Sequence, residues 1–132
     1  MKKLLIIILL FITSAYAEVI NEYTTQQLID SGIKIIDIRT VAEWKEDGLV
    51  KNSIPIEFFN DKGEYNVPVF IEKLAEHVKP NEKFALICHT GSRTRIVSQF
   101  LSKQFKMNVI NLRGGTAYAK AKGIKLYPYK GQ

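Results

Sequence analysis

The chain has 132 residues, of which 46% are hydrophobic and 24% are charged, and its formal net charge is +6. This length and balance predict one domain with a single hydrophobic core, and the absence of internal repeats excludes a repeat protein. The single cysteine excludes an internal disulfide, so any disulfide would have to join two molecules.

Residues 1–17 have the pattern of a secretory signal peptide. Lys2 and Lys3 precede an apolar run over residues 4–12, and Ala15-Tyr16-Ala17 is a small-residue cleavage site. The run is shorter than the roughly 20 apolar residues that a membrane-spanning helix needs. We therefore expect cleavage after Ala17, no membrane attachment afterwards, and an exported domain over residues 18–132, in the periplasm or secreted.

The first half of the chain alternates helix and strand signals. In order, they predict a helix that stops at Gly32, a buried strand over 33–38, a short helix over 40–48 opened by a capping box, an extended piece over 52–56, and a helix from Pro68 to Val78.

The second half continues the alternation. It predicts a buried strand over 84–88, a helix over 92–105, a strand over 109–112, a short helix that starts at Gly114-Gly115, and an aromatic tail over 124–132 that packs back on the surface. Strands separated by helices imply a parallel sheet with helices on both faces. Ligands bind at the carboxyl ends of such strands, which is where Cys88 lies.

Charge is distributed unevenly along this domain. Residues 18–82 hold all 13 acidic residues and seven basic residues, whereas residues 83–132 hold ten basic residues and no acidic one. The positive half contains Cys88, and a positive field favours a thiolate and attracts anions. Nucleic acid is the usual partner of a basic block, but an exported protein seldom meets it, so we expect a small anion instead and no nucleic acid.

The stretch CHTGSRTR, residues 88–95, joins a strand to a helix. The first N–H groups of a helix have no internal partner, and a curved run of loop amides forms an anion-binding nest. Gly91 permits the positive φ that such a loop needs, and Arg93 supplies a planar fork for an anion. The combination predicts that Cys88 is a nucleophilic thiolate at neutral pH; a buried, inert cysteine is the alternative.

The residues Cys88 to Thr94 (CHTGSRT) resemble the C-x-x-G-x-R-[ST] active-site loop of rhodanese-type sulfurtransferases. Asp37-Ile38-Arg39 with Glu43-Trp44 is similar to the family's D-[VI]-R…E-[FW] segment. Residues 48–54 stand where the family has G-H-I-x-G-A, although Leu49 and Val50 depart from it, and residues 109–115 resemble its strand ending in Gly-Gly. The likeness covers nearly all of residues 18–132, and exported single-domain members such as the phage-shock periplasmic rhodanese are the nearest kind.

The resemblance implies a rhodanese-like α/β domain with a central parallel sheet of about five strands and helices on both faces. Cys88 would attack the outer sulfur of an anionic donor such as thiosulfate, and the resulting persulfide would pass its sulfur to cyanide or a thiol. No metal or organic cofactor is required. The residues expected to bind substrate are His89, Thr90, Gly91, Ser92, Arg93, Thr94 and Arg39.

Other functions remain open at this point. A cysteine-dependent phosphatase or arsenate reductase uses the same kind of loop, but the related dual-specificity phosphatases have one residue more than the six from Cys88 to Arg93. Such a reaction also needs a general acid, for which Asp37 is the candidate. A non-catalytic rhodanese-like binding module and a redox module are further alternatives, and the sequence leaves donor, acceptor and oligomeric state open.

Two residues have competing interpretations. His89 is either a general base or a solvent-facing neighbour of the nucleophile, and a thiolate that is already stabilised needs no base. Arg39 either contacts substrate or forms a structural ion pair with Asp37, and strand ends favour the pair.

Overall fold

The computed structural model describes residues 17–131, so the predicted signal peptide lies outside the described residues except for Ala17. The chain forms, in order, β1 (Val19–Tyr23), α1 (Gln26–Asp30), β2 (Ile35–Asp37), α2 (Val41–Asp47), β3 (Leu49–Val50), β4 (Ile54–Pro55), α3 (Val67–Ala75), β5 (Phe84–Ile87), α4 (Ser92–Phe105), β6 (Val109–Arg113), α5 (Gly115–Ala121) and β7 (Leu126–Tyr127).

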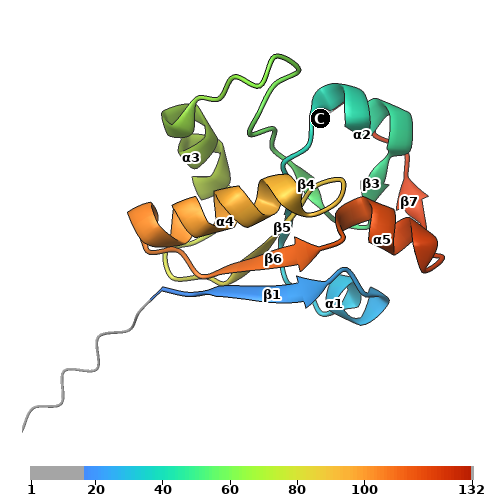
Figure 1. Cartoon of the computed structure of the whole chain (residues 1–132), viewed down its shortest axis with the longest axis horizontal. Helices are drawn as coiled ribbons and strands as arrows, with labels where there is room; N and C mark the ends of the chain where they lie inside the picture. The colour runs from blue at the N-terminus through green and yellow to red at the C-terminus, as the bar shows by residue number, and fades with distance from the viewer. Residues whose placement is uncertain (1–16, 132) are drawn as a thin grey trace, which may run out of the picture.

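The main sheet contains five strands in the order β1-β6-β5-β2-β4, and all its pairings are parallel. Figure 1 shows α3 and α4 together on one side of this sheet, with α1 on the other. The prediction of a parallel sheet of about five strands between helices is therefore confirmed. Strands β3 and β7 form a separate antiparallel pair.

Strand β5 lies in the middle of the sheet and is buried on both faces. Phe84, Leu86 and the following Cys88 belong to the core beneath α3 and α4. Ala85 and Ile87 belong to a second core that α1, β3 and β7 help to close. A continuous apolar run is what a central parallel strand requires, and it delivers Cys88 to the carboxyl end of the sheet.

Local signals explain where the helices begin. Thr40 and Glu43 form a complete capping box at the start of α2, as expected. Asn66 caps α3 ahead of Pro68 in the first turn. The helix predicted over 92–105 is confirmed at both ends, and the residue that precedes it, Gly91, is left-handed with a φ of 96°.

Strand β1 was not predicted, and it completes the sheet by pairing with β6 over five residues. The expected packing of the tail is confirmed, because β7 pairs with β3 and the Tyr129 ring lies 5.4 Å from that of Trp44. Within residues 17–131, no helix combines the length and apolar character that crossing a bilayer requires.

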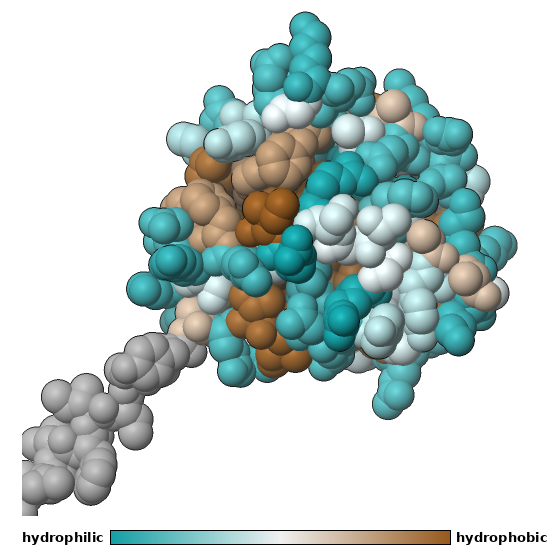
Figure 2. Space-filling model, viewed as in Figure 1, coloured by the Kyte–Doolittle hydropathy of each residue, from teal (hydrophilic) through white to brown (hydrophobic). Residues whose placement is uncertain are grey.

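Apolar side chains reach the surface beside α4. Figure 2 shows them gathered between α3 and α4 on the face turned toward the viewer. They surround a hollow of about 280 Å³ lined by Phe58, Phe59, Tyr65, Val67, Ile96, Val97 and Phe100. The helix that follows the cysteine loop therefore has an apolar neighbourhood on one flank.

Candidate active site

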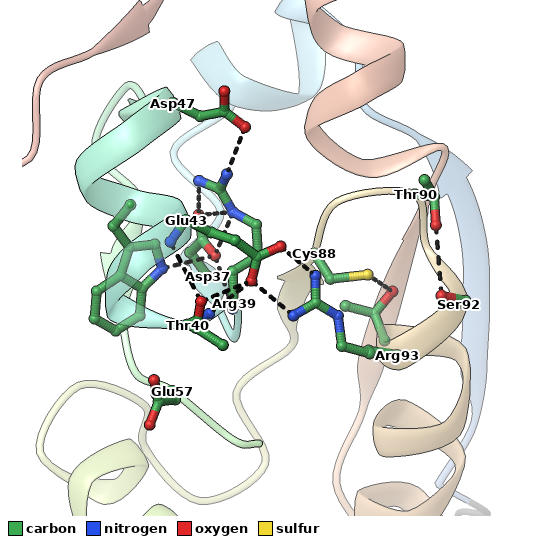
Figure 3. Close-up of polar contacts among 12 residues, drawn as sticks. Asp37, Arg39, Thr40, Glu43, Asp47, Glu57, Cys88, Thr90, Ser92 and Arg93 are labelled. Atoms are coloured by element: carbon green, nitrogen blue, oxygen red, sulfur yellow. Dashed lines mark hydrogen bonds and ion pairs between the residues drawn. The ribbon is translucent and has the colours of Figure 1, made fainter. Parts of the chain in front are cut away.

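The cysteine loop connects β5 to α4, and the neighbouring carboxyl end of β2 brings a second group of polar residues beside it (Figure 3). The side chains of His89, Thr90 and Ser92 are exposed, whereas Cys88 is 0% exposed. The hydroxyl oxygens of Thr90 and Ser92 lie 3.4 Å apart at the outer side of the loop.

The Cys88 sulfur lies inside the turn of the loop and has polar neighbours there. The Gly91 amide donates a hydrogen bond to Sγ at 3.2 Å, and the Thr94 hydroxyl oxygen lies 3.6 Å from the same sulfur. The positive φ of Gly91 then turns the backbone away from the sulfur and into α4. The sulfur is thus buried but not sealed in hydrocarbon.

The start of α5 fixes the loop from behind. The amide of Thr116 donates to the Cys88 carbonyl at 2.9 Å, and the amide of Ala117 donates to the His89 carbonyl at 2.9 Å. A Cβ at Gly115 would overlap both carbonyl oxygens, so only glycine allows this approach. The cysteine loop therefore requires glycine in the Gly-Gly pair that follows β6, because a side chain at Gly115 would prevent the backbone contact.

Arg93 does not project freely into solvent. Its guanidinium donates two hydrogen bonds to the carboxylate of Glu43, at 2.9 and 2.7 Å. Figure 3 shows this side chain reaching from α4 across to α2. These bonds are the main cause that lowers the pKa of Glu43 to about 2, while partial burial opposes the shift; the same carboxylate raises the pKa of Arg93.

Arg39 occupies a separate network and is itself fully buried. Its guanidinium pairs with Asp37 at 2.8 Å, donates to the Gly48 carbonyl at 2.7 Å and lies 3.5 Å from Asp47. The indole N–H of Trp44 donates to Asp37 at 3.1 Å. This arrangement supports the ion-pair interpretation. Arg39 is 0% exposed and its guanidinium is already engaged in this network, so the geometry favours the ion pair over the expected contact with substrate.

The structure therefore brings Cys88, Gly91, Arg93 and Thr94 around one site and places Arg39 elsewhere. Sequence reasoning missed two kinds of participant. The sequence marks Glu43 as a helix cap and as part of the E-[FW] motif but predicts no contact with the cysteine loop, yet this residue holds Arg93 from 50 residues away. Asn111, on β6, accepts a 2.6 Å hydrogen bond from Thr94, and no local signal marks it.

Metal binding finds no support among residues 17–131, where no group of three or more histidine, cysteine, aspartate or glutamate side chains is placed to hold an ion.

Curated relatives resemble parts of this chain. It is 27% identical over 93 residues to Rhodanese-like domain-containing protein 17 of Arabidopsis thaliana, covering 68% of this chain and 60% of that protein. It is 29% identical over 87 residues to the Putative sulfur carrier protein YrkF of Bacillus subtilis, covering 65% and 40%. The chain thus spans less than two thirds of the length of these relatives.

Solved structures share the fold. A rhodanese-like domain protein from Staphylococcus aureus has a TM-score of 0.58 at 20% identity, covering 83% of this chain and 98% of that one. A rhodanese-related protein from Thermoplasma volcanium has a TM-score of 0.57 at 25% identity, covering 74% and 85%. Residues 21–122 match the family described as Rhodanese-like domain, and the chain accordingly belongs to the rhodanese-like domain family.

Proposed function

We propose that this protein is a sulfurtransferase that carries a sulfane sulfur on Cys88. The observation that carries the proposal is the hydrogen bond from the Gly91 amide to the Cys88 sulfur, within a loop that opens a 14-residue helix. An amide and a helix N-terminus aimed at one sulfur favour its anionic form, which is the form that attacks and that persists as a persulfide.

The proposed reaction has two displacements. The Cys88 thiolate attacks the outer sulfur of thiosulfate, a sulfur–sulfur bond forms, and the bond to the sulfonate breaks as sulfite leaves with the electron pair. Cyanide or a thiolate then attacks the terminal sulfur of the persulfide and leaves as thiocyanate or a new persulfide. The second step restores the Cys88 thiolate, and no net oxidant is consumed.

The donor has to reach a sulfur that is fully covered in this conformation. We propose that the exposed side chains of His89, Thr90 and Ser92 turn aside while the loop backbone stays in place, since a 3.4 Å contact between two exposed hydroxyls is a weak restraint. The opposite wall, held by α5 amides and by the Arg93–Glu43 pair, stays in place.

Phosphatase chemistry fits this site less well. Asp37, the candidate general acid, is 0% exposed and already accepts hydrogen bonds from Arg39 and Trp44. Glu43, the carboxylate beside Arg93, has a pKa lowered to about 2 and so carries no proton to donate at neutral pH. The surroundings of these two carboxylates therefore favour sulfur transfer over phosphate-ester hydrolysis.

Mass spectrometry of the intact protein tests the proposal. After incubation with thiosulfate, we expect a gain of one sulfur at Cys88, and we expect cyanide to remove it as thiocyanate. Cys88→Ser should take up no sulfur and should unfold within about 1 kcal/mol of the parent, since its hydroxyl keeps Gly91 and Thr94 as partners.

The outcome that contradicts the proposal is an unmodified Cys88 after thiosulfate treatment of folded protein. A second incubation with arsenate belongs in the same experiment, because one Arabidopsis relative, 27% identical over 100 residues and matched over 59% of its length, is named Protein HIGH ARSENIC CONTENT 1. A gain of arsenic at Cys88 without a gain of sulfur would favour the reductase alternative.

We also propose that the protein acts after export, with residues 1–17 removed. The support is the apolar run followed by Ala15-Tyr16-Ala17. The mass and N-terminal residue of the protein recovered from cells test this proposal: an N-terminal Glu18 is expected, and an intact Met1 on the active protein would refute it.

A further inference from the structure

A chain of buried and part-buried polar side chains leads from the Cys88 sulfur to the edge of the sheet. Thr94 lies 3.6 Å from Sγ and donates to the Oδ1 of Asn111 at 2.6 Å. The Nδ2 of Asn111 donates to the Oδ1 of Asn21 at 2.9 Å. Asn21 and Asn111 face each other in the register of β1 and β6, so the backbone fixes their separation.

Because these hydrogen-bonded side chains are largely buried, the direction in which each donates its hydrogen matters. Thr94 is 0% exposed and Asn111 is 3% exposed, so each depends on protein partners rather than bulk solvent for its hydrogen bonds. Asn21 is exposed and lines, with Thr90 and Arg95 among others, a shallow hollow of about 470 Å³ outside the loop. One end of the chain therefore touches the sulfur and the other end touches solvent.

The Thr94 hydroxyl has a single hydrogen but three acceptors within reach. They are Asn111 Oδ1 at 2.6 Å, the Gly91 carbonyl at 3.2 Å and Cys88 Sγ at 3.6 Å. While the hydrogen goes to Asn111, Thr94 presents a lone pair to the sulfur, and that arrangement suits a protonated thiol. A thiolate needs the hydrogen to point the other way.

Rotation of two amides supplies the opposite arrangement. If Asn111 and Asn21 each turn by half a rotation, the NH₂ of Asn111 donates to Thr94 and the NH₂ of Asn21 donates to Asn111. The Thr94 hydrogen is then free to point at Sγ. Both arrangements satisfy every member of the chain, and they differ only in which state of the sulfur they favour.

We propose that Asn111 is a positioning residue, which acts through Thr94 and with Asn21 sets whether Cys88 is held as thiol or thiolate. The inference rests on the proposed function in one respect: control of the ionisation of Cys88 matters because Cys88 has to be a thiolate before it attacks the sulfur donor. It assigns no contact between Asn111 and substrate. The role is testable through the ionisation of the only cysteine in the chain.

The test is an ultraviolet titration of the thiolate, with Cys88→Ser as the blank. Asn111→Asp offers only acceptors, holds the Thr94 hydrogen away from Sγ and adds a like charge, so the thiolate fraction at pH 7 should fall about tenfold. Asn111→Leu keeps the branched shape and the number of side-chain heavy atoms but has no acceptor, so the thiolate fraction should equal or exceed that of the parent. These opposite results would support the proposal.

Asn21→Asp provides a variant at an exposed position, where folding is not at risk. Its carboxylate can only accept, so it holds Asn111 in the orientation that suits the thiol, and we expect the thiolate fraction to fall several-fold. The fall should persist in 1 M salt, where the screening length shortens to about 3 Å and a through-space charge effect is removed. Asn108 takes no part in the hydrogen bonds that link Thr94, Asn111 and Asn21, so Asn108→Asp should leave the thiolate fraction unchanged.

Equal titrations for the Asp and Leu variants of Asn111, or an Asn21→Asp effect that salt abolishes, would overturn the proposal even if thermal stability changes. Sulfur uptake from thiosulfate is measured separately on each variant. If the variants differ in thiolate titration as expected but the protein takes up no sulfur, only the proposed sulfurtransferase function is refuted. The failure of that function and the failure of this inference are therefore distinguishable.

Discussion

At the scale of single residues, glycine conformation decides whether the cysteine loop can exist. Gly115 has a φ of 56°, and its Cα lies against the Cys88 and His89 carbonyls. Thr116 and Ala117 could not donate to those carbonyls if a side chain intervened. The amino end of α5 is thus built for contact with the loop rather than for an external ligand.

Gly115→Ala should therefore destabilise the protein by about 3 kcal/mol and reduce sulfur transfer at least tenfold, because backbone must move away from Cys88. Gly123→Ala is the matched control. Gly123 has a φ of 77° and open space where a methyl group would stand, so this change should cost about 1 kcal/mol and leave transfer unchanged. Urea unfolding measures the stability of both variants, and the thiosulfate assay measures their sulfur transfer. Equal losses in the two variants would refute the role given to the contact between Gly115 and the cysteine loop.

Arg93 combines a structural bond with a charge beside the sulfur. Arg93→Ala should reduce kcat/KM for thiosulfate about tenfold or more, since no other described guanidinium is held at this position, and it should cost about 1 kcal/mol of stability. Arg93→Lys keeps the charge without the two-pronged geometry and should recover part of the activity. Unchanged thiosulfate kinetics in Arg93→Ala would restrict Arg93 to the structural role.

At the scale of elements, Glu43 links two helices because its carboxylate accepts hydrogen bonds from both of them. Its carboxylate accepts from the Thr40 amide at the start of α2 and from Arg93 at the start of α4. The residue that caps α2 thus also holds α2 beside the cysteine loop, through its ion pair with Arg93. Loss of its charge should loosen both contacts at once.

Glu43→Gln should lower the free energy of unfolding by about 1 kcal/mol at pH 7, after allowance for solvent screening. The pKa of Glu43 is about 2 in the folded protein and 4.5 as the reference value, so the carboxylate stabilises the fold above pH 4.5. That contribution is lost as the pH falls toward 2. The stability difference between parent and variant should shrink over this interval, and a constant difference would argue against the ion pair.

At the scale of the whole molecule, the tail after α5 closes the second core. Ile124 and Leu126 pack against that core, and β7 pairs with β3. Truncation after Gly123 should therefore cost about 3 kcal/mol, as two part-buried apolar side chains and a strand pairing are lost. Removal of Gly131 and Gln132 alone is the control and should be neutral by urea unfolding.

How much of this was visible in the sequence depended on distance along the chain. The helix over 92–105 and the capping box at Thr40 were predictable because their signals lie within a few residues. Strand β1 was not, because its residues alternate only weakly and its partner is about 90 residues away. The Glu43–Arg93 pair and the Thr94–Asn111 bond were unpredictable for the same reason.

The hydrogen bonds from Thr116 and Ala117 to the carbonyls of Cys88 and His89 have a consequence for biosynthesis. A ribosome makes those donors almost 30 residues after the cysteine. A partly made chain that stops before α5 therefore holds its thiol in an unfinished turn, and the reactive centre matures only after Thr116 and Ala117 have been added.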